Sequence, residues 1–240
     1  MKIVMPIAGR GSRFREVGHR EPKPLISILQ RPMIQWALDC IDYRPEDLIF
    51  ICLQEHIERD HIDQHLKTLF SDSITLVTTD GVTQGAASTV LLARDFIDNS
   101  EECVIYNTDQ FFKSDLMNAI KNKSDDVTGI IPVFKATSSK WSFARVGPNG
   151  YVNEVAEKIP ISTNATVGLY YFAHGSDFVW AADQMISKDI RRNNEFYVCP
   201  VYNELIQRGD KIQIVESDFM WGLGTPEDVE HFERYYRGNL

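Results

Sequence analysis

Five cationic side chains crowd into one short segment near the N-terminus of a chain whose formal net charge is −9. They fall within fourteen positions and are Arg10, Arg13, Arg15, Arg20 and Lys23. Gly9 and Gly11 stand at the start of the segment, where glycine tolerates positive φ and lets backbone N–H groups approach a ligand closely. Backbone donors and concentrated positive charge together suit a polyphosphate. The segment therefore predicts a binding site for a polyphosphate.

Three other interpretations of this segment exist, and two of them fail on the residue types. A dinucleotide fingerprint of the form G-x-G-x-x-G needs glycine at position 14, which is Phe14. A P-loop needs G-x-x-x-x-G-K-[ST], and no part of the segment matches it. The third interpretation is a basic surface loop without a ligand. The coincidence of a strand, two glycines, spaced arginines and the Pro-Lys-Pro run at 22–24 favours the binding site instead.

Short apolar runs and amphipathic segments alternate along the first half of the chain. Ile3–Ile7 predicts a first strand, and the continuous run Leu48–Leu53 is typical of a strand buried on both faces. Further strands are predicted at 74–77, 104–106 and 127–134, and helices near 34–41, 62–70, 86–96 and 116–120. This alternation predicts an α/β fold with three layers, α/β/α, around a mostly parallel central sheet. In such sheets, ligands bind beyond the carboxyl ends of the strands, where the basic segment lies.

The pattern changes after residue 135. Two apolar runs at 143–146 and 151–155 flank Gly-Pro-Asn-Gly and predict a β-hairpin. The remaining predicted elements are strands at 167–172 and 212–215, helices near 176–187 and 197–208, and a closing helix at 226–236 capped by Thr225. No linker divides the chain. We expect one domain over 1–240, with a first part at about 1–134 and a smaller, β-rich part at about 135–240 packed on it.

The composition argues against several classes of protein. An acidic chain lacks the basic surface on which non-specific nucleic-acid binding depends. The four cysteines show no C-x-x-C spacing, which predicts free thiols and a reducing compartment. The N-terminus has no signal-peptide pattern, and no apolar stretch approaches the roughly 18 residues of a membrane-spanning helix. We therefore expect a cytoplasmic protein without nucleic-acid or membrane partners.

Several short motifs are spread over the chain in a fixed order. They are Gly9-Arg10-Gly11-Ser12-Arg13 with Pro22-Lys23, Gln84-Gly85-Ala86-Ala87, Asp109, Glu157-Lys158, Val167-Gly168-Leu169-Tyr170 and Gly224-Thr225-Pro226-Glu227. In this order they resemble the motifs of the sugar-phosphate nucleotidylyltransferase family, the NTP transferases of GT-A-like fold. Two departures stand out. The family often has an aspartate, as a second metal ligand, where this chain has Gly222, and a glycine where it has Thr108. Asp218 lies upstream, but its spacing does not match that second ligand, which stays open.

The resemblance implies a reaction in which an NMP group passes from an NTP to a phosphomonoester and pyrophosphate is released. The attacking phosphate oxygen is already anionic near neutral pH, so catalysis depends mainly on positioning and on stabilising charge. Arg13 and Lys23 are the implied catalytic residues. Arg13 would stabilise the leaving β,γ-phosphates, and Lys23 would bridge the α-phosphate and the incoming phosphate. Asp109 would hold Mg²⁺, a cation that prefers oxygen ligands.

The same resemblance implies a Rossmann-like nucleotide-binding part at about 1–134 and an acceptor-binding part at about 135–240. It also implies which residues bind each substrate. The expected nucleotide-binding residues are Ile7, Ala8, Gly9, Arg10, Gly11, Ser12, Gln84, Gly85, Ala86 and Thr108. The expected acceptor-binding residues are Glu157, Lys158 and Gly168, and residues 195–197 are a further segment that could approach the acceptor. A homodimer is expected from the family. Since the chain ends just after its closing helix, we expect the short form without the C-terminal β-helix of longer relatives.

The base, the acceptor and two other function classes stay open. Within the family that the chain resembles, the small size suits cytidylyl- or uridylyltransferases of surface-polysaccharide or lipid-precursor pathways. We expect CTP, with UTP, GTP and dTTP as alternatives, and a role in surface polysaccharide or capsule precursor synthesis. A nucleotide-sugar-dependent glycosyltransferase of the related fold is a second class, although such enzymes usually carry D-x-D where this chain has Asn107. A non-catalytic nucleotide-sensing relative is a third class, suggested by Gly222.

Overall fold

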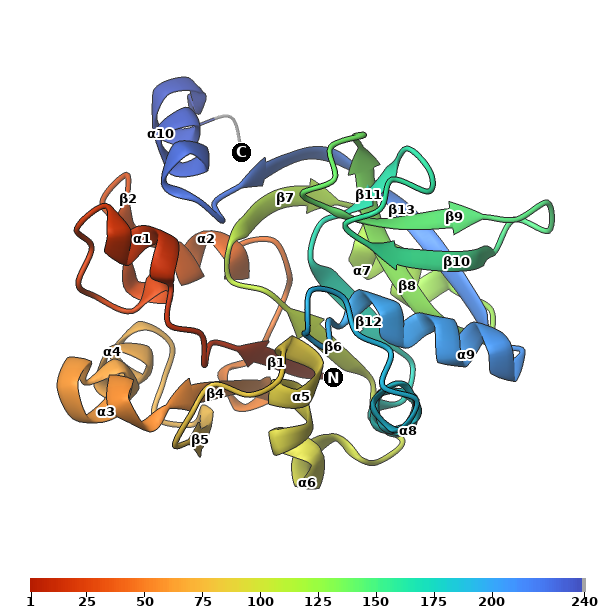
Figure 1. The fold of residues 1–240 in the computed structure, drawn as a ribbon, viewed down its shortest axis with the longest axis horizontal. Coiled ribbons are helices and arrows are strands. Elements are labelled where there is room, and N and C mark those ends of the chain that lie inside the picture. Colours follow the sequence, from red (N-terminus) through yellow and green to blue (C-terminus); the bar gives the residue numbers. More distant parts are fainter. Residues whose placement is uncertain (239–240) are drawn as a thin grey trace.

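The computed structural model describes residues 1–238 and shows an α/β fold around one large sheet (Figure 1). The sheet has eleven strands, with the order β10-β9-β11-β8-β12-β6-β1-β4-β5, and β13 joins it at β8 and also pairs with β7. The strands are β1 (Lys2–Pro6), β4 (Leu48–Leu53), β5 (Thr75–Thr79), β6 (Cys103–Tyr106), β7 (Gln110–Ser114), β8 (Val127–Lys135), β9 (Ser142–Val146), β10 (Val152–Glu157), β11 (Asn164–Thr166), β12 (Leu169–Phe172) and β13 (Lys211–Gly222). A separate ribbon consists of β2 (Ser27–Ile28) and β3 (Arg31–Pro32).

The N-terminal part of the sheet is parallel. β1 lies between β4 and β6, with Val4 opposite Ile49 on one side and Ile105 on the other, and β5 runs parallel to β4. Every residue of β4 and β6 is buried, as their continuous apolar runs predict. Because these strands are parallel, the segments that follow β1 and β6 leave the sheet at the same edge. The fold therefore brings the basic segment at 9–24 close to Asp109.

The C-terminal part of the sheet is largely antiparallel, so the sheet as a whole is mixed. β12 pairs antiparallel with β6 and with β8, and β9 and β10 form the predicted hairpin around 147–150. The prediction of an α/β fold is confirmed, but the parallel arrangement is largely confined to the strands before β7, with β13 alongside β8 as the later parallel pair. Parallel neighbours need a crossover connection, which is usually a helix. The chain between β8 and β12 contains only β9, β10 and β11 and no helix, and β8 and β12 pair antiparallel.

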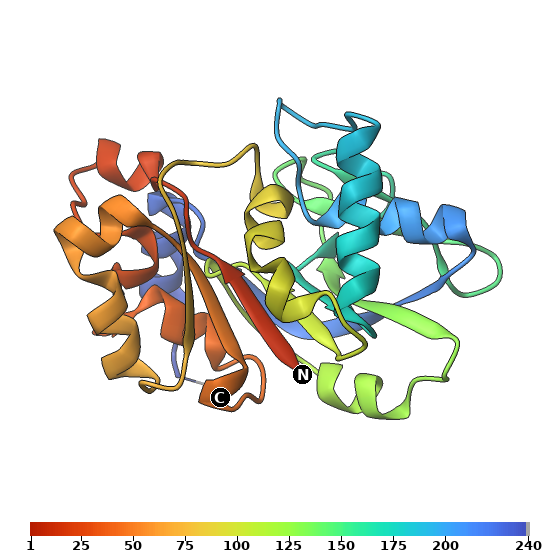
Figure 2. The ribbon, with the colours of Figure 1, turned by 90° about the horizontal axis from the view of Figure 1, so that it is seen from below.

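Helices cover both faces of the sheet, as the three-layer prediction requires. Along β1, Val4 belongs to the hydrophobic cluster that includes α5, α8 and α9, whereas Ile3 and Met5 belong to the cluster that includes α2, α4 and α7. Figure 2 shows α8 and α9 together at one end of the molecule and α1 to α4 at the other. The helices are α1 (Ser12–Glu16), α2 (Met33–Leu38), α3 (Gln54–Asp60), α4 (Ile62–Leu69), α5 (Ala86–Val90), α6 (Arg94–Ile97), α7 (Leu116–Asn122), α8 (Gly175–Ser187), α9 (Tyr202–Arg208) and α10 (Pro226–Tyr235).

A third hydrophobic cluster ties the C-terminal helix to the N-terminal segment. Phe14 of α1, Trp36 of α2 and Phe232 of α10 are buried in it together with Phe111 and Leu223. Thr225 caps α10 as predicted, because its hydroxyl accepts the backbone N–H of Asp228 at 3.2 Å. The start of α10 is thereby held close to the segment that follows β1.

Several elements differ from the predicted ones: α1, α3, β2, β3 and β11 were not predicted, and the helix predicted near 197–208 begins with a 3₁₀ turn at Cys199–Val201. The helix predicted at 86–96 is divided into α5, a 3₁₀ turn at Leu91–Ala93 and α6. The strand predicted at 167–172 is interrupted at Gly168, whose φ of +80° separates β11 from β12. β13 continues to Gly222 because its second half pairs with β7, a strand absent from the predicted set.

Cys40, Cys52, Cys103 and Cys199 are free thiols. No helix among the described residues combines the length and the apolar character that crossing a bilayer requires.

Candidate active site

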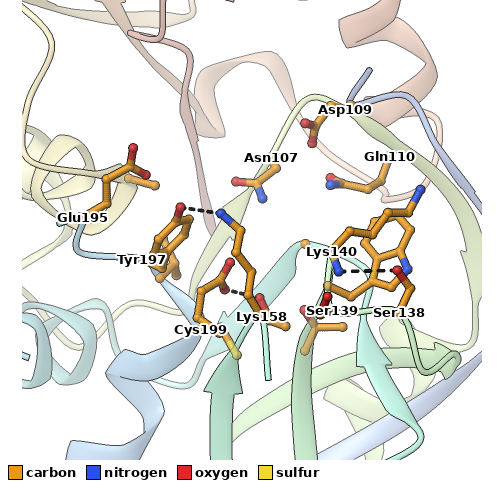
Figure 3. A pocket seen from close by; sticks show the side chains of 18 of the residues that line it. Asn107, Asp109, Gln110, Ser138, Ser139, Lys140, Lys158, Glu195, Tyr197 and Cys199 are labelled. Carbon is orange, nitrogen blue, oxygen red and sulfur yellow. Dashed lines mark hydrogen bonds between the residues drawn. The ribbon is translucent and has the colours of Figure 1, made fainter. Parts of the chain in front are cut away.

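A polar cavity of about 790 Å³ lies at the edge of the sheet where β1 and β6 end. Its wall combines α1, the residues after β6, the loop before β9, the end of β10 and the start of α10 (Figure 3). The volume falls within the range of small-molecule sites. Among the site residues expected from the sequence, those that line this cavity are Arg13, Ala86, Asp109, Glu157, Lys158 and Gly168.

The segment after β1 is held by a left-handed glycine and a buried aromatic ring. Gly11 has φ of +61° and precedes α1, and a Cβ at this position would lie 3.1 Å from Cβ of Lys23. Phe14, which stands where a dinucleotide fingerprint would have glycine, is 2% exposed and anchors the segment in the third hydrophobic cluster. The ammonium of Lys23 lies 5.7 Å from the centre of this ring. Both ends of the basic segment are thus fixed against one another.

Lys23 and Asp109 meet although they are 86 residues apart in the sequence. Lys23 Nζ donates to Asp109 Oδ2 at 2.6 Å, and each side chain keeps about a fifth of its surface exposed. The other carboxylate oxygen, Asp109 Oδ1, is buried and accepts no hydrogen bond from residues 1–238. The backbone holds the position as well, since the N–H of Leu223 donates to the carbonyl of Asp109 at 2.7 Å. The contact joins Lys23, expected to bridge the phosphates, to Asp109, expected to hold Mg²⁺.

The far wall of the cavity carries a buried carboxylate and a lysine. Glu157 is 8% exposed, and Ser142 Oγ donates to its Oε2. Burial raises the pKa of Glu157, while the Ser142 hydrogen bond and the charge of Lys158 partly oppose this rise. Lys158 Nζ donates to the hydroxyl of Tyr197 at 2.7 Å and lies 4.6 Å from the centre of its ring. Because a phenol is neutral, this contact leaves the charge of Lys158 available to an anionic ligand.

Gly168 makes room for an amide side chain. Its φ is +80°, and a Cβ here would lie 2.7 Å from Gln110 Oε1, which is closer than real contacts allow. The carbonyl of Gly168 accepts the N–H of Asn107 at 3.0 Å. Gly168 therefore lines the cavity and helps to hold the residues around Asp109.

The expected nucleobase segment is bound to the segment at 195–197. A Cβ on Gly85 would lie 2.5 Å from both N and O of Phe196, so only glycine fits there. The N–H of Phe196 donates to Gln84 O at 2.8 Å, and the N–H of Ala87 donates to Phe196 O at 2.9 Å. Phe196 is buried, whereas its neighbours Glu195 and Tyr197 line the cavity. The two sides of the cavity are thus joined by backbone hydrogen bonds.

The remaining expected residues lie around the cavity rather than in its wall. Ile7, Ala8 and Thr108 are buried, and Gly9, Arg10 and Ser12 are exposed. Arg10 forms an exposed ion pair with Glu55 at 3.5 Å. Asp218 is exposed on β13.

Asn107, Gln110, Lys140 and Asp228 also line the cavity and were not among the expected site residues. Asn107 and Gln110 lie within two residues of Asp109, just after a buried strand. Because ligands bind beyond the carboxyl ends of such strands, this position in the sequence could have indicated both residues. Lys140 follows two serines in a polar run. Asp228 gives no signal, because an acidic residue in the first turn of a helix is ordinary.

Comparisons with known proteins agree with this geometry. The family model described as nucleotidyl transferase matches residues 2–237. The chain is 26% identical over 95% of its length to the low-salt glycan biosynthesis nucleotidyltransferase Agl11 of Haloferax volcanii, of which it covers 64%. It is 22% identical over 98% of its length to the UTP–glucose-1-phosphate uridylyltransferase AglF of the same organism, of which it covers 96%.

Other relatives are longer or are known as structures. The chain spans 56% of a bifunctional sugar-1-phosphate nucleotidylyltransferase/acetyltransferase of Sulfurisphaera tokodaii, at 23% identity over the whole of this chain. The nucleoside-diphosphate-sugar pyrophosphorylase from Vibrio cholerae RC9 superposes with a TM-score of 0.79 at 25% identity, covering 97% of this chain and 99% of that one. The inositol-1-phosphate CTP transferase from T. maritima shares the fold, with a TM-score of 0.72 at 14% identity over 95% of this chain and 90% of that one. Since the family model matches almost every described residue, the chain belongs to the nucleotidyl transferase family.

Proposed function

We propose that this nucleotidyltransferase transfers an NMP group from an NTP to a sugar phosphate or a similar small phosphomonoester and releases pyrophosphate. The observation that carries the proposal is the 2.6 Å contact between Lys23 and Asp109 in a polar cavity at the carboxyl ends of β1 and β6. The names of the relatives, which include a glucose-1-phosphate uridylyltransferase and a glycan biosynthesis nucleotidyltransferase, support a sugar phosphate as acceptor.

The proposed reaction needs positive charge more than it needs a base. A phosphate oxygen of the acceptor attacks the α-phosphorus in line, and the bond from that phosphorus to the leaving pyrophosphate oxygen breaks. Two anions have to approach each other, so groups that neutralise and position them lower the barrier. We assign Arg13 to the leaving phosphates and Lys23 to the α-phosphate and the incoming phosphate. Arg13 and Asp109 both line the cavity, and Lys23 contacts Asp109.

The carboxylate oxygen atoms of Asp109 are suitable ligands for Mg²⁺. Asp109 Oδ1 is a buried carboxylate oxygen without a partner among residues 1–238, and a Cβ on Gly224 would lie 3.2 Å from Asp109 Oδ2. Mg²⁺ in proteins is commonly held by one or two carboxylates together with substrate phosphates and water. When bound, the ion would offset negative charge on the phosphates. Asp109 would hold it after the ammonium of Lys23 turns towards the substrate.

The far wall of the cavity is suited to the acceptor. Glu157 is buried and its carboxylate can accept hydrogen bonds from hydroxyl groups, and the ammonium of Lys158 can contact the acceptor phosphate. Gly168 and the backbone around it complete this side. We assign the base to the backbone around Ala8, Gly9, Gln84 and Gly85, with the other expected nucleotide-binding residues around them, and propose CTP as the preferred donor. A role in precursors for surface polysaccharide or capsule would follow from such a product.

A panel of substrates tests the proposal. Purified protein with Mg²⁺ is incubated with each of CTP, UTP, GTP and dTTP and a set of sugar 1-phosphates and other phosphomonoesters, and pyrophosphate is measured. We expect pyrophosphate release that needs both substrates. A glycosyltransferase would instead consume a nucleotide sugar without releasing pyrophosphate, and a nucleotide-sensing protein would bind NTP without turnover. Either outcome would contradict the proposal.

A further inference from the structure

The start of α10 brings a second carboxylate to the space beside Asp109. Asp228 is the third residue of this helix, lines the same cavity, and has a side chain that is 21% exposed. A Cβ on Gly224 would lie 3.2 Å from Asp109 Oδ2 and 3.9 Å from Asp228 Oδ2. The two carboxylates therefore face one small space, which stays open because residue 224 has no side chain.

A side chain at position 222, where a carboxylate would resemble the family pattern, would collide with Trp141 as it lies in this structure. A Cβ on Gly222 would lie 2.9 Å from Cη2 of Trp141, which is closer than real contacts allow. The indole is fixed, since it packs edge-on against Phe134 with the ring centres 5.2 Å apart. The same Cβ would lie 3.7 Å from Asp228 Oδ2. Trp141 thus fills the space that a side chain at 222 would need, and Asp228 brings a carboxylate close to that position from a different element.

Several carboxylate and amide oxygen atoms of residues that line this cavity lack partners among residues 1–238. Asp228 Oδ1 accepts a hydrogen bond from Lys140 Nζ at 2.8 Å, while Oδ2 faces the two glycines. Asp109 Oδ1 is buried without a donor among residues 1–238. Gln110 is a separate indication of a ligand, because it is only 8% exposed, lines the cavity, and its Oε1 also lacks a partner among these residues. Buried oxygen atoms are normally satisfied, so this group points to a missing cation or ligand.

The backbone holds both carboxylates in place. Gly222 pairs with Gln110 in the ladder between β13 and β7, and the N–H of Leu223 donates to the carbonyl of Asp109. The N–H of Asp228 donates to Thr225 Oγ1, which fixes the first turn of α10. The arrangement therefore depends on secondary structure rather than on mobile loops.

We propose that Asp228 supplies the second protein carboxylate for the divalent cation, in place of the residue that is absent at position 222. This inference rests on the proposed function. No three His, Cys, Asp or Glu side chains in the described part of the chain are grouped so that they could hold a metal ion alone. Two carboxylates completed by substrate phosphates and water are an arrangement that Mg²⁺ accepts. Without the cation, Lys23 and Lys140 each neutralise one of the two carboxylates.

Replacing Lys140 distinguishes a cation-binding role of Asp228 from a role in which Asp228 only holds Lys140 in place. If Asp228 only anchored Lys140, removing either partner would have the same consequence. If Asp228 binds the cation, Lys140 competes with that cation for the carboxylate. Lys140→Ala and Asp228→Asn should then change cation affinity in opposite directions.

The experiment is a titration of the full chain with Mn²⁺ alone, in which electron paramagnetic resonance measures the free ion. We expect Asp228→Asn to weaken Mn²⁺ binding by about tenfold or more, on the scale seen when groups that hold a metal are removed. Lys140→Ala should bind Mn²⁺ at least as tightly as the unmodified chain. Asp218→Asn, which changes an exposed aspartate on β13, is the matched control and should bind unchanged. Gly224→Ala places a methyl group between the carboxylates and should also weaken Mn²⁺ binding. This second variant tests the inference if Asp228→Asn does not fold.

Three results would overturn the inference. The unmodified chain could fail to bind Mn²⁺, or folded Asp228→Asn could bind Mn²⁺ with an affinity within twofold of that of the unmodified chain. The third result is that Lys140→Ala weakens Mn²⁺ binding as much as Asp228→Asn does. Pyrophosphate release by the unmodified chain is measured separately with Mg²⁺, an NTP and a sugar 1-phosphate. Release together with unchanged Mn²⁺ binding by Asp228→Asn refutes the role of Asp228 and leaves the proposed function standing. Absence of release from every substrate pair refutes the proposed function.

Discussion

Replacing Lys23 by methionine removes one positive charge from the centre of the site and preserves most of the side-chain volume that packs near Phe14. The ammonium now lies 2.6 Å from a carboxylate oxygen, so it can approach a phosphate oxygen equally closely. Two unit charges about 4 Å apart interact by about 4 kcal/mol at an effective dielectric constant near 20. Losing one such preorganised group typically lowers turnover by 10²–10³-fold, or about 3–4 kcal/mol. We expect Lys23→Met to lower kcat/KM by this factor in a pyrophosphate-release assay.

The control for this variant is Lys67→Met, which removes an exposed lysine from α4 and should leave the rate unchanged. Removing Lys23 also leaves Asp109 without its ion-pair partner, so thermal unfolding is measured to confirm that the variant is folded. A loss smaller than threefold in a folded variant would refute the assignment of Lys23 to the phosphates. A loss confined to KM, with kcat unchanged, would show that Lys23 only binds substrate.

Three further changes test other parts of the site. Asp109→Asn should lower pyrophosphate release by at least about 10²-fold, and higher Mg²⁺ concentrations should recover part of the activity; full activity at low Mg²⁺ would contradict its role. Burial raises the pKa of Glu157, so ionising its carboxyl group lowers the stability of the folded chain. Glu157→Gln should therefore gain stability relative to the unmodified chain as the pH rises above about 4.5. A difference in melting temperature that does not change with pH would contradict this. Gly168→Ala should lower the free energy of unfolding by about 1–3 kcal/mol in urea titrations. The reason is that φ of residue 168 is +80° and the added methyl group would collide with Gln110. Unchanged stability would show that the turn relaxes freely.

The parts of the fold that the sequence predicts are those set by local patterns. β4 is continuous in apolar residues and is buried throughout, so its type and its bounds follow from the pattern alone. Thr225 and Pro226 define the start of α10 by local capping chemistry. The contact between Lys23 and Asp109 is consistent with the expectation that residues after β1 and β6 meet at one edge of a parallel sheet.

The parts that local patterns do not predict depend on distant partners. β7 has five residues, and it is a strand because it pairs with β13, which lies about a hundred residues later in the chain. This pairing also extends β13 to Gly222, where the apolar pattern alone ends the strand earlier. Trp141 occupies the space beside Gly222, and the carboxylate of Asp228 lies near the site because α10 packs beside α1 and α2. Such relations between separate elements are not visible in the spacing of residues.

The most direct test of the central claim is a crystal structure of the chain with Mg²⁺ and a non-hydrolysable analogue of the NTP selected by the substrate panel. We expect the triphosphate to lie against the backbone of residues 9–13, with Arg13 and Lys23 in contact with its oxygens and the metal ion bound to Asp109. A triphosphate bound elsewhere, with the basic segment unoccupied and Lys23 still paired with Asp109, would contradict the proposed mechanism.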